Sequence, residues 1–231
     1  MRKTTLFFVA AGLLAFAACK KDDKSPGPST GPTARVMFMN GIISSDSIKV
    51  KINDTMQNSV PSLYYSAGTG YVNVRASSSL KFTFYNPANP NADNFSITEN
   101  VGANKTYSVF FAGASAAVKS AVFIEDDLTV PASGKAKVRF VNLSPDPSFD
   151  SVTAVLNTSS VATNVLYKQV TPFMEVDAGT YSVKIGNPNI FTFEELTSQQ
   201  LINGKIYTYV LTGIQASGTY DLKLNSVIIH N

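Results

Sequence analysis

The sequence contains one internal repeat with an interval of about 100 residues, and this repeat constrains the fold more than any other feature. Residues 34–40 (ARVMFMN) match residues 136–142 (AKVRFVN), an offset of 102. Later matches keep offsets of 100 to 104: residues 46–48 with 150–152, 86–87 with 187–188, and 105–107 with 205–207. Solenoid units are only about 20 to 50 residues long, so this interval indicates a duplicated domain. We expect a first unit over residues 34–130, a short connector, and a second unit over residues 136–231.

Each unit shows the alternation of apolar and polar residues that is typical of β-strands. In residues 48–52, for example, Ile48, Val50 and Ile52 alternate with polar residues. Similar segments cover residues 71–75, 82–84, 107–111, 137–141, 181–185 and 207–211. Turn sequences rich in Gly, Pro, Asn and Asp separate them.

These patterns predict an all-β fold of two tandem sandwiches, immunoglobulin-like or transthyretin-like, with about seven strands each. The order of the strands stays open. Only residues 194–202 (EELTSQQLI) have the charge and length of a helix, for two turns at most.

The N-terminal segment has the order of a secretory signal peptide, with basic residues, an apolar run and then small residues. The apolar run covers residues 6–16 and is shorter than the ~20 residues that a membrane-spanning helix needs. Ala17 and Ala18 precede Cys19, the only cysteine. This site is similar to the lipobox of bacterial lipoproteins, which implies that residues 1–18 are removed and that Cys19 carries a lipid. The membrane is then a partner through this anchor; the alternative is an ordinary signal peptide.

Charged residues follow the cysteine directly. Lys21, Asp22 and Asp23 resemble the export signal of Bacteroidetes lipoproteins, which implies a lipid-anchored outer-membrane protein that faces the cell exterior. The alternative is that these charges form only a solvated tether, and the protein can then face the periplasm instead. Residues 25–33 (SPGPSTGPT) contain only Pro, Gly, Ser and Thr, so residues 19–33 form a lipidated terminus and a flexible linker.

The charge balance argues against nucleic acid as a partner. Removal of residues 1–18 takes away Arg2 and Lys3, which leaves 17 basic and 16 acidic residues with no basic cluster. A lipidated Cys19 forms no disulfide and no thiolate metal site. The sequence predicts no cofactor and no metal.

Residues 136–150 (AKVRFVNLSPDPSFD) resemble the opening of domain-of-unknown-function family 4397 (DUF4397), in which a strand of the form vRfvN leads into lSPD and a further aspartate. The matching residues are Val138, Phe140, Asn142, Ser144, Pro145, Asp146 and Asp150. The first unit keeps Val36, Phe38, Asn40 and Asp46 but has GIISS in place of the Ser-Pro-Asp element. The resemblance implies an all-β extracytoplasmic domain and supplies no activity.

No group of residues points to catalysis. Asp146 and Asp150 are possible Ca²⁺ or acid–base carboxylates, but Ser-Pro-Asp-Pro is turn chemistry and favours a structural role. The adjacent pairs 126–127 and 194–195 are expected to point to opposite faces of a strand. His230, the only histidine, is penultimate and is interpreted as a solvated or edge-strand residue. We therefore expect a protein that is not an enzyme.

Three interpretations of the function remain. The first is a binding or adhesion module for an extracellular glycan or protein, which contacts its ligand through loops. The second is a structural envelope spacer or accessory subunit, and the third is an unrecognised hydrolase. Separately, Ser47, Thr55 and Ser151 each follow an aspartate in a pattern that resembles the Bacteroidetes O-glycosylation motif.

Overall fold

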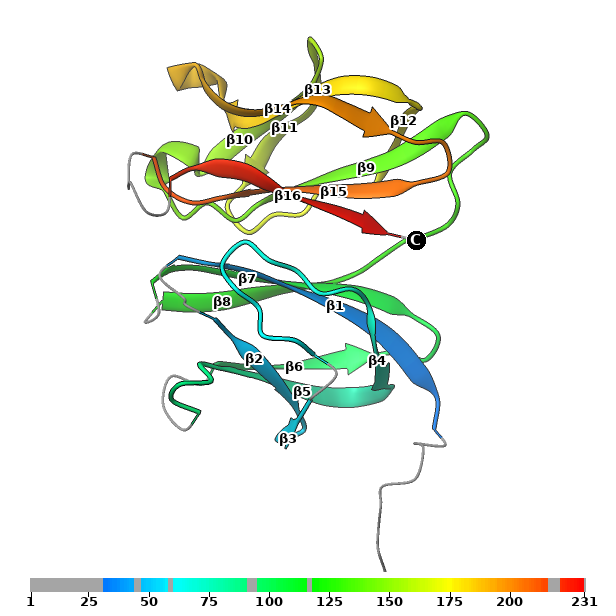
Figure 1. Ribbon diagram of the computed structural model, residues 1–231, viewed down its shortest axis with the longest axis vertical. Coiled ribbons are helices and arrows are strands. Elements are labelled where there is room, and N and C mark those ends of the chain that lie inside the picture. The colour runs from blue at the N-terminus through cyan, green and yellow to red at the C-terminus, as the bar shows by residue number, and fades with distance from the viewer. Residues whose placement is uncertain are drawn as a thin grey trace, which may run out of the picture. The chain divides into compact units, whose positions relative to one another are not determined.

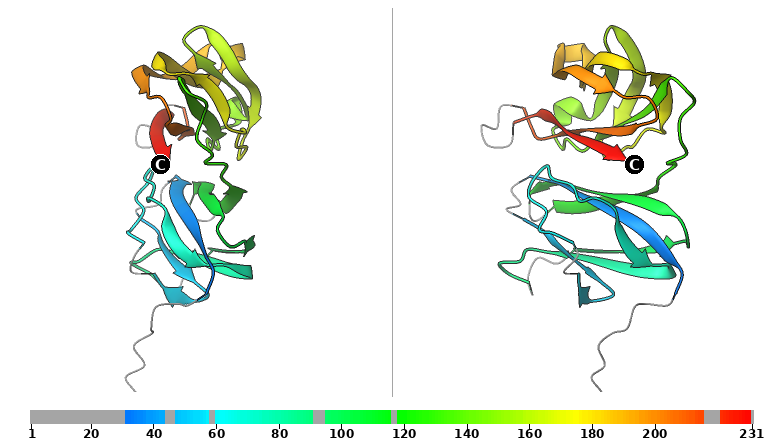
Figure 2. Two further views of the ribbon diagram at one scale, coloured as in Figure 1. Left: turned by 90° about the vertical axis from the view of Figure 1, so that its right-hand side faces the viewer. Right: turned by 45° about the vertical axis from the view of Figure 1, so that its right-hand side comes forward.

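The computed structural model describes residues 31–43, 47–57, 60–90, 95–115, 118–215 and 221–230 (Figure 1). The predictions for Cys19, Lys21, Asp22 and Asp23 lie outside these residues. Within them, no helix has the length and apolar character to cross a membrane. The strands follow one another along the chain in two sets, which Figure 2 shows from two further directions.

The first sandwich is built from two four-stranded sheets. The sheet that packs against the other sandwich, called here the inner sheet, has the order β4-β1-β7-β8. The other sheet, called here the outer sheet, has the order β3-β2-β5-β6. The inner strands are β1 (Thr33–Ile42), β4 (Val72–Arg75), β7 (Thr106–Ser115) and β8 (Val118–Glu125). The outer strands are β2 (Lys49–Ile52), β3 (Thr55–Met56), β5 (Ser77–Tyr85) and β6 (Phe95–Val101).

The second sandwich repeats this arrangement. Its inner sheet has the order β12-β9-β15-β16 and its outer sheet the order β11-β10-β13-β14. The inner strands are β9 (Lys135–Asn142), β12 (Met174–Asp177), β15 (Ile206–Thr212) and β16 (Lys223–His230). The outer strands are β10 (Ser151–Leu156), β11 (Ser159–Leu166), β13 (Gly179–Asn187) and β14 (Thr192–Leu201). Two 3₁₀ turns, η1 (Pro147–Phe149) and η2 (Pro188–Ile190), lie in its loops.

Strand order therefore confirms the duplication, because each strand of the first sandwich has a counterpart eight strands later. In both inner sheets the first strand pairs in parallel with the seventh, and the remaining ladders are antiparallel. The predicted all-β sandwiches are confirmed. Each described sandwich has eight strands instead of the expected seven.

The two units also repeat individual hydrogen bonds at an offset of 102 residues. The Thr69 hydroxyl accepts a hydrogen bond from the Phe38 N–H (3.0 Å), and the Thr171 hydroxyl accepts one from the Phe140 N–H (2.9 Å). The Asn40 amide donates to the Leu63 carbonyl, and its counterpart Asn142 donates to the Val165 carbonyl. Both asparagines thus connect the end of the first strand of their unit to the backbone of a segment 23 residues later in the chain.

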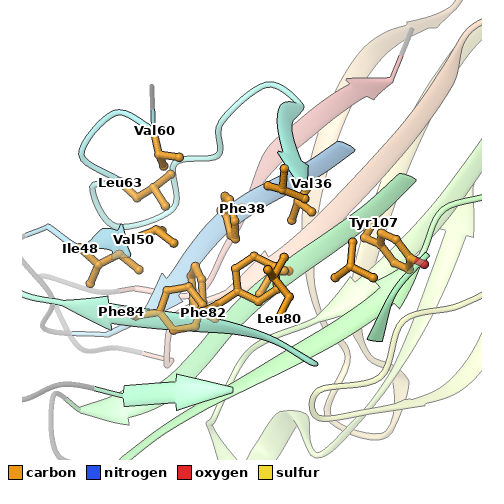
Figure 3. Close-up of a cluster of buried hydrophobic side chains, with 14 of the residues drawn as sticks. Val36, Phe38, Ile48, Val50, Val60, Leu63, Leu80, Phe82, Phe84 and Tyr107 are labelled. Carbon is orange, nitrogen blue, oxygen red and sulfur yellow. The ribbon is translucent and has the colours of Figure 1, made fainter. Parts of the chain in front are cut away.

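Each sandwich has its own apolar core between its two sheets. In the first, Phe38 of β1 packs edge-on against Phe82 and Phe84 of β5, with ring centroids 5.7 and 6.3 Å apart (Figure 3). In the second, the rings of Phe140 on β9 and Tyr209 on β15 stack at 5.8 Å. Full burial of each such ring stabilises the fold by about 1.5–3 kcal/mol.

The inner sheets bury their other face as well. Side chains that point away from the two cores form a third apolar cluster with members from both sandwiches: Met37, Met39, Phe110, Ala112, Val141, Leu143 and Val210. Consequently the central strands β1, β7, β9 and β15 are buried almost without interruption, whereas outer strands such as β6 alternate between half-buried and exposed residues.

The helical alternative for residues 194–202 is wrong, because residues 194–201 belong to strand β14. Eight residue pairs join β14 to β13, with a register shift between Tyr181 and Val183. Ser198 near this shift has a φ of 54°, which a helix would not contain. Pairing with β13 therefore outweighs the local helix preference of the Glu and Gln residues.

We predict that Asn142→Ala lowers the free energy of unfolding by about 2–4 kcal/mol, because it leaves several buried backbone groups without partners. Asn142 donates to the Phe149 and Val165 carbonyls and accepts from the Ser144 N–H. Urea unfolding followed by circular dichroism measures the change. The control, Asn73→Ala on an exposed position of β4, should stay within about 0.5 kcal/mol. Equal effects of the two substitutions would contradict the structural role of Asn142.

Candidate functional site

Two features of the described residues go beyond ordinary packing. The first is a set of loops at one end of the second sandwich, called here the loop cluster: residues 144–150, 187–191 and 213–215. The second is a group of interacting side chains between the inner sheets, called here the buried polar cluster: Tyr71, Ser108, Asp126, Arg139, Thr208 and His230.

Asp146 holds the loop cluster together with its two carboxylate oxygens. Oδ1 accepts a hydrogen bond from the Ser148 N–H (2.8 Å) and so caps η1. Oδ2 accepts one from the Gln215 N–H (2.7 Å), which lies on the loop after β15. Both oxygens are therefore engaged with backbone donors, which suits a structural role better than proton transfer.

The other residues of the family motif support the same loops. Ser144 donates its hydroxyl to the Gly213 carbonyl (2.7 Å), and Pro145 links this residue to Asp146. Asp150 is exposed and closes η1, where its N–H donates to the Pro147 carbonyl (3.4 Å). In the described residues, no group of three His, Cys, Asp or Glu side chains is arranged to hold a metal ion.

The β13–β14 loop joins the loop cluster through Asn187. Its Oδ1 accepts from the Asn189 N–H (2.9 Å), and its Nδ2 donates to the Ser148 carbonyl on η1 (2.6 Å). Gly186 allows the two strands to approach closely before the loop, since a Cβ there would lie 2.1 Å from the Thr192 carbonyl oxygen. The loop is thus fixed at both its base and its side.

Phe191 projects from this fixed loop into solvent. Its side chain is 89% exposed, and the preceding Ile190 is exposed as well. The backbone of Phe191 is left-handed, with φ 54° and ψ 30°. Residues with a Cβ pay roughly 1–2 kcal/mol for this conformation, which glycine adopts freely. A bulky aromatic residue here gains nothing from the core and is strained, a combination that points to a contact outside the chain.

Arg139 of β9 is the centre of the buried polar cluster and is only 1% exposed. Its Nη1 donates to Asp126 Oδ1 (2.6 Å), and Nη2 donates to the Ser108 hydroxyl (2.9 Å). Nε donates to the Thr208 hydroxyl (2.8 Å). The guanidinium also lies 4.3 Å from the centre of the Phe173 ring. Arg139 therefore binds strands and segments of both sandwiches at once.

The remaining hydrogen bonds assign the protons of the cluster. Tyr71 donates its hydroxyl proton to Asp126 Oδ2 (2.7 Å), so its oxygen accepts from His230 Nδ1. Thr208 accepts from Arg139 and therefore uses its own proton toward His230 Nε2 (2.7 Å). The hydrogen bonds thus assign a neutral His230 with its proton on Nδ1. In this series of hydrogen bonds, each donor faces an acceptor.

The expectation of a solvated His230 is wrong. The residue does lie on the edge strand β16, but it is 1% exposed and contacts the rings of both Tyr71 and Phe173. Burial, followed by the charge of Arg139, lowers the pKa of His230 to about 4. Burial and Asp126 raise the pKa of Tyr71 above its ordinary value.

Three consecutive carboxylates at the end of β8, those of Glu125, Asp126 and Asp127, are each held in an ion pair. A pocket of about 550 Å³ contains Glu125, Asp126 and Asp127 on its wall. Each carboxylate has its own cation: Lys105 for Glu125 (2.5 Å), Arg139 for Asp126 (2.6 Å) and Lys137 for Asp127 (3.1 Å). Hydrogen bonds from Thr129 and Lys137 lower the pKa of Asp127 to about 2. Asp127 is therefore charged at neutral pH, and each of the three carboxylates is held by a cation.

The proposed glycosylation residues lie on the described surface in different surroundings. Thr55 is exposed on β3, and Ser47 is half-buried before β2. The Ser151 hydroxyl donates to Asn164 Oδ1 (2.8 Å), so modification there replaces this hydrogen bond. Among the tyrosines that the structure describes, Tyr207 and Tyr209 belong to the second core, and only Tyr64 is largely exposed.

Sequence reasoning missed the two residues on which these features depend. Arg139 occupies the repeat position of the buried Met37, and a charged residue in place of an apolar one was the available signal. Phe191 follows an Asn-Pro-Asn turn, where exposed aromatic residues are unusual.

Comparisons with known proteins add one family and little else. The family model described as domain of unknown function (DUF4397) matches residues 34–150 and 147–226. Comparison with curated sequences gave no match. Among solved structures, a family 26 carbohydrate-binding module of Eubacterium rectale Amy13K, in complex with maltoheptaose, is 8% identical. The alignment covers 86% of this chain and 96% of that one with a TM-score of 0.25, which does not indicate a shared fold.

We predict that Gly186→Ala destabilises the second sandwich by at least about 2 kcal/mol, because the new Cβ meets backbone atoms that cannot move aside. The Thr192 carbonyl oxygen and the Phe193 Cα would lie 2.1 and 2.5 Å away. Gly179→Ala at the other end of β13 is the matched control, since its Cβ would meet only the Tyr181 ring at 3.7 Å. Thermal unfolding of both variants tests this, and a stable Gly186→Ala protein would refute the proposed close approach.

We predict that Arg139→Met costs about 3–5 kcal/mol of stability, because it leaves the Asp126 carboxylate buried without its cation. The substitution restores the residue type of the equivalent position, Met37. Adding Asp126→Leu should recover most of the loss, since the apolar pair needs no desolvation of charges. Denaturant unfolding of both variants measures this; a double variant as unstable as Arg139→Met would show that the charges themselves contribute the stability.

Proposed function

The chain belongs to the DUF4397 family, and we propose that it is a non-catalytic binding module that holds an extracellular glycan or protein at the loop cluster of its second sandwich. The observation that carries this proposal is Phe191, an exposed aromatic ring on a strained but fixed loop. Aromatic side chains offer a large contact area for little loss of side-chain entropy.

The fixed loop reduces the cost of binding. Asp146 and Asn187 connect η1, η2 and the loop after β15 through hydrogen bonds, so little loop ordering is left for the ligand to induce. The neighbouring Ile190 extends the apolar area beside the ring, and Asn189 supplies an amide next to it. An apolar centre with a polar surround is the usual composition of a binding hot spot.

The proposed location is the outer membrane, with a lipid on Cys19 as the anchor and the folded part outside the cell. The motif Lys21-Asp22-Asp23 supports export to the surface, and residues 25–33 then act as the tether. O-glycans on Ser47, Thr55 and Ser151 belong to the same proposal.

The absence of catalysis is also part of the proposal. It is supported by the cations paired with Glu125, Asp126 and Asp127, and by the backbone bonds that occupy Asp146. A second candidate function, a structural envelope spacer, is favoured by one observation. The buried polar cluster links the two inner sheets through Arg139, which stiffens the connection between the sandwiches.

We predict that Phe191→Ala reduces ligand binding at least tenfold, because hot-spot aromatics typically contribute about 2 kcal/mol or more. Immobilised polysaccharides form one arm of the measurement and immobilised extracellular matrix proteins the other. Tyr64→Ala is the matched control, since Tyr64 is a 65% exposed aromatic residue of the first sandwich. Binding in neither arm by the wild type would favour the spacer.

Phe191→Gly separates binding from folding. Glycine relieves the left-handed backbone but adds freedom to the unfolded chain, so the free energy of unfolding should change by no more than about 1 kcal/mol. Binding should fall as in Phe191→Ala. A variant that binds normally would remove Phe191 from the site.

A further inference from the structure

The buried polar cluster contains the only histidine of the chain, and that histidine is surrounded from every side. Thr208 reaches it from β15, Tyr71 from the segment before β4, and Phe173 from the segment before β12. These contacts come from both sandwiches, so His230 is part of the interface and not of either core.

The charged groups around His230 leave it without a carboxylate of its own. Asp126 already accepts from Arg139, Tyr71 and Ser108. Arg35 of β1 lies 5.2 Å from the centre of the Tyr71 ring and adds a second positive charge on that side. Lys137 of β9 pairs with Ile206 of β15, which in turn pairs with His230 of β16. The Lys137 ammonium donates to Asp127 and Thr129.

A protonated His230 does not fit this arrangement. Its new Nε2–H would face the Thr208 hydroxyl, which already accepts from Arg139 and would lose the acceptor for its own proton. The imidazolium would also repel the Arg139 guanidinium, and burial of both groups keeps this repulsion strong. The contact between the sandwiches therefore requires the neutral ring.

We propose that His230 is the acid-sensitive element of a latch between the two sandwiches, and that its protonation breaks the bonds to Tyr71 and Thr208 and releases the inner sheets from one another. The device is independent of the binding role of Phe191, which lies in a loop that the latch does not contact. Each sandwich keeps its own apolar core when the latch opens.

The direction of the pH effect follows from linkage. In the separated state His230 is hydrated on an edge strand and has an ordinary pKa of about 6.5. In the closed state its pKa is lowered to about 4. Closing therefore favours the deprotonated ring, is strongest above pH 6.5, and is lost as the pH falls toward 4. The ratio of closed to open molecules should fall about 20-fold between pH 7 and pH 5.

The methionines and the single histidine of the chain provide native probes. We would label the full chain in detergent micelles with ¹³C-methyl methionine and ¹³C-histidine and record NMR spectra from pH 8 to pH 4.5. Met37 and Met39 lie in the cluster between the sandwiches, Met174 packs against the second core, and Met56 is exposed. The latch predicts that Met37 and Met39 move toward solvent-exposed shifts together with the His230 titration, while Met174 stays unchanged.

Three variants complete the test. His230→Gln has no titratable group at this position, so Met37 and Met39 should keep their shifts at all pH values. If His230→Gln already opens the interface at pH 8, the Tyr71→Phe variant is used instead, and its interface should open at a higher pH than that of the wild type. Glu194→Gln is the control, because burial also raises the pKa of that carboxyl, and it should open like the wild type. The latch is refuted if Met37 and Met39 stay fixed while His230 titrates, or if Met174 changes with them.

Discussion

The central strands of the two inner sheets are buried on both faces, and the rest of the structure follows from that constraint. Each inner sheet covers its own core on one side and contributes to a shared apolar cluster on the other. A polar group placed between them must find all its partners there, because no solvent can replace a missing hydrogen bond. Arg139 makes three hydrogen bonds there, and its guanidinium faces the Phe173 ring.

A buried ion pair of this kind contributes specificity more than stability. Apolar side chains such as Met37 and Val210 pack in many registers, since Met in particular adapts its shape. The pair of Arg139 and Asp126 is satisfied in only one register, which also places Ser108 and Thr208 on the same guanidinium. Ser108 and Thr208 lie at equivalent positions of β7 and β15. The duplication therefore supplied both hydroxyl groups that accept hydrogen bonds from Arg139.

The sequence predicted the duplication and the strands because both leave local patterns. Alternation over residues 48–52 and 181–185 corresponds to β2 and β13. Long-range pairing leaves no such pattern, which is why strand order stayed open and residues 194–202 resembled a helix. His230 was misjudged for the same reason: its neighbours Tyr71 and Arg139 are distant in the chain, and proximity to a terminus says nothing about them. The turn role of the Ser-Pro-Asp element, by contrast, is local and was accessible.

The two copies have diverged at different places, and the differences separate their roles. The second copy carries the Ser-Pro-Asp element, and Asp146 uses it to connect three loops around an exposed aromatic residue. The first copy has GIISS there and contributes Asp126 and Tyr71 to the interface instead. Under the proposed binding role, a force on a ligand at the second copy reaches the first copy through the shared apolar cluster and the pair of Arg139 and Asp126. The proposed role therefore places demands on Asp126 in the interface as well as on Phe191 in the loop cluster.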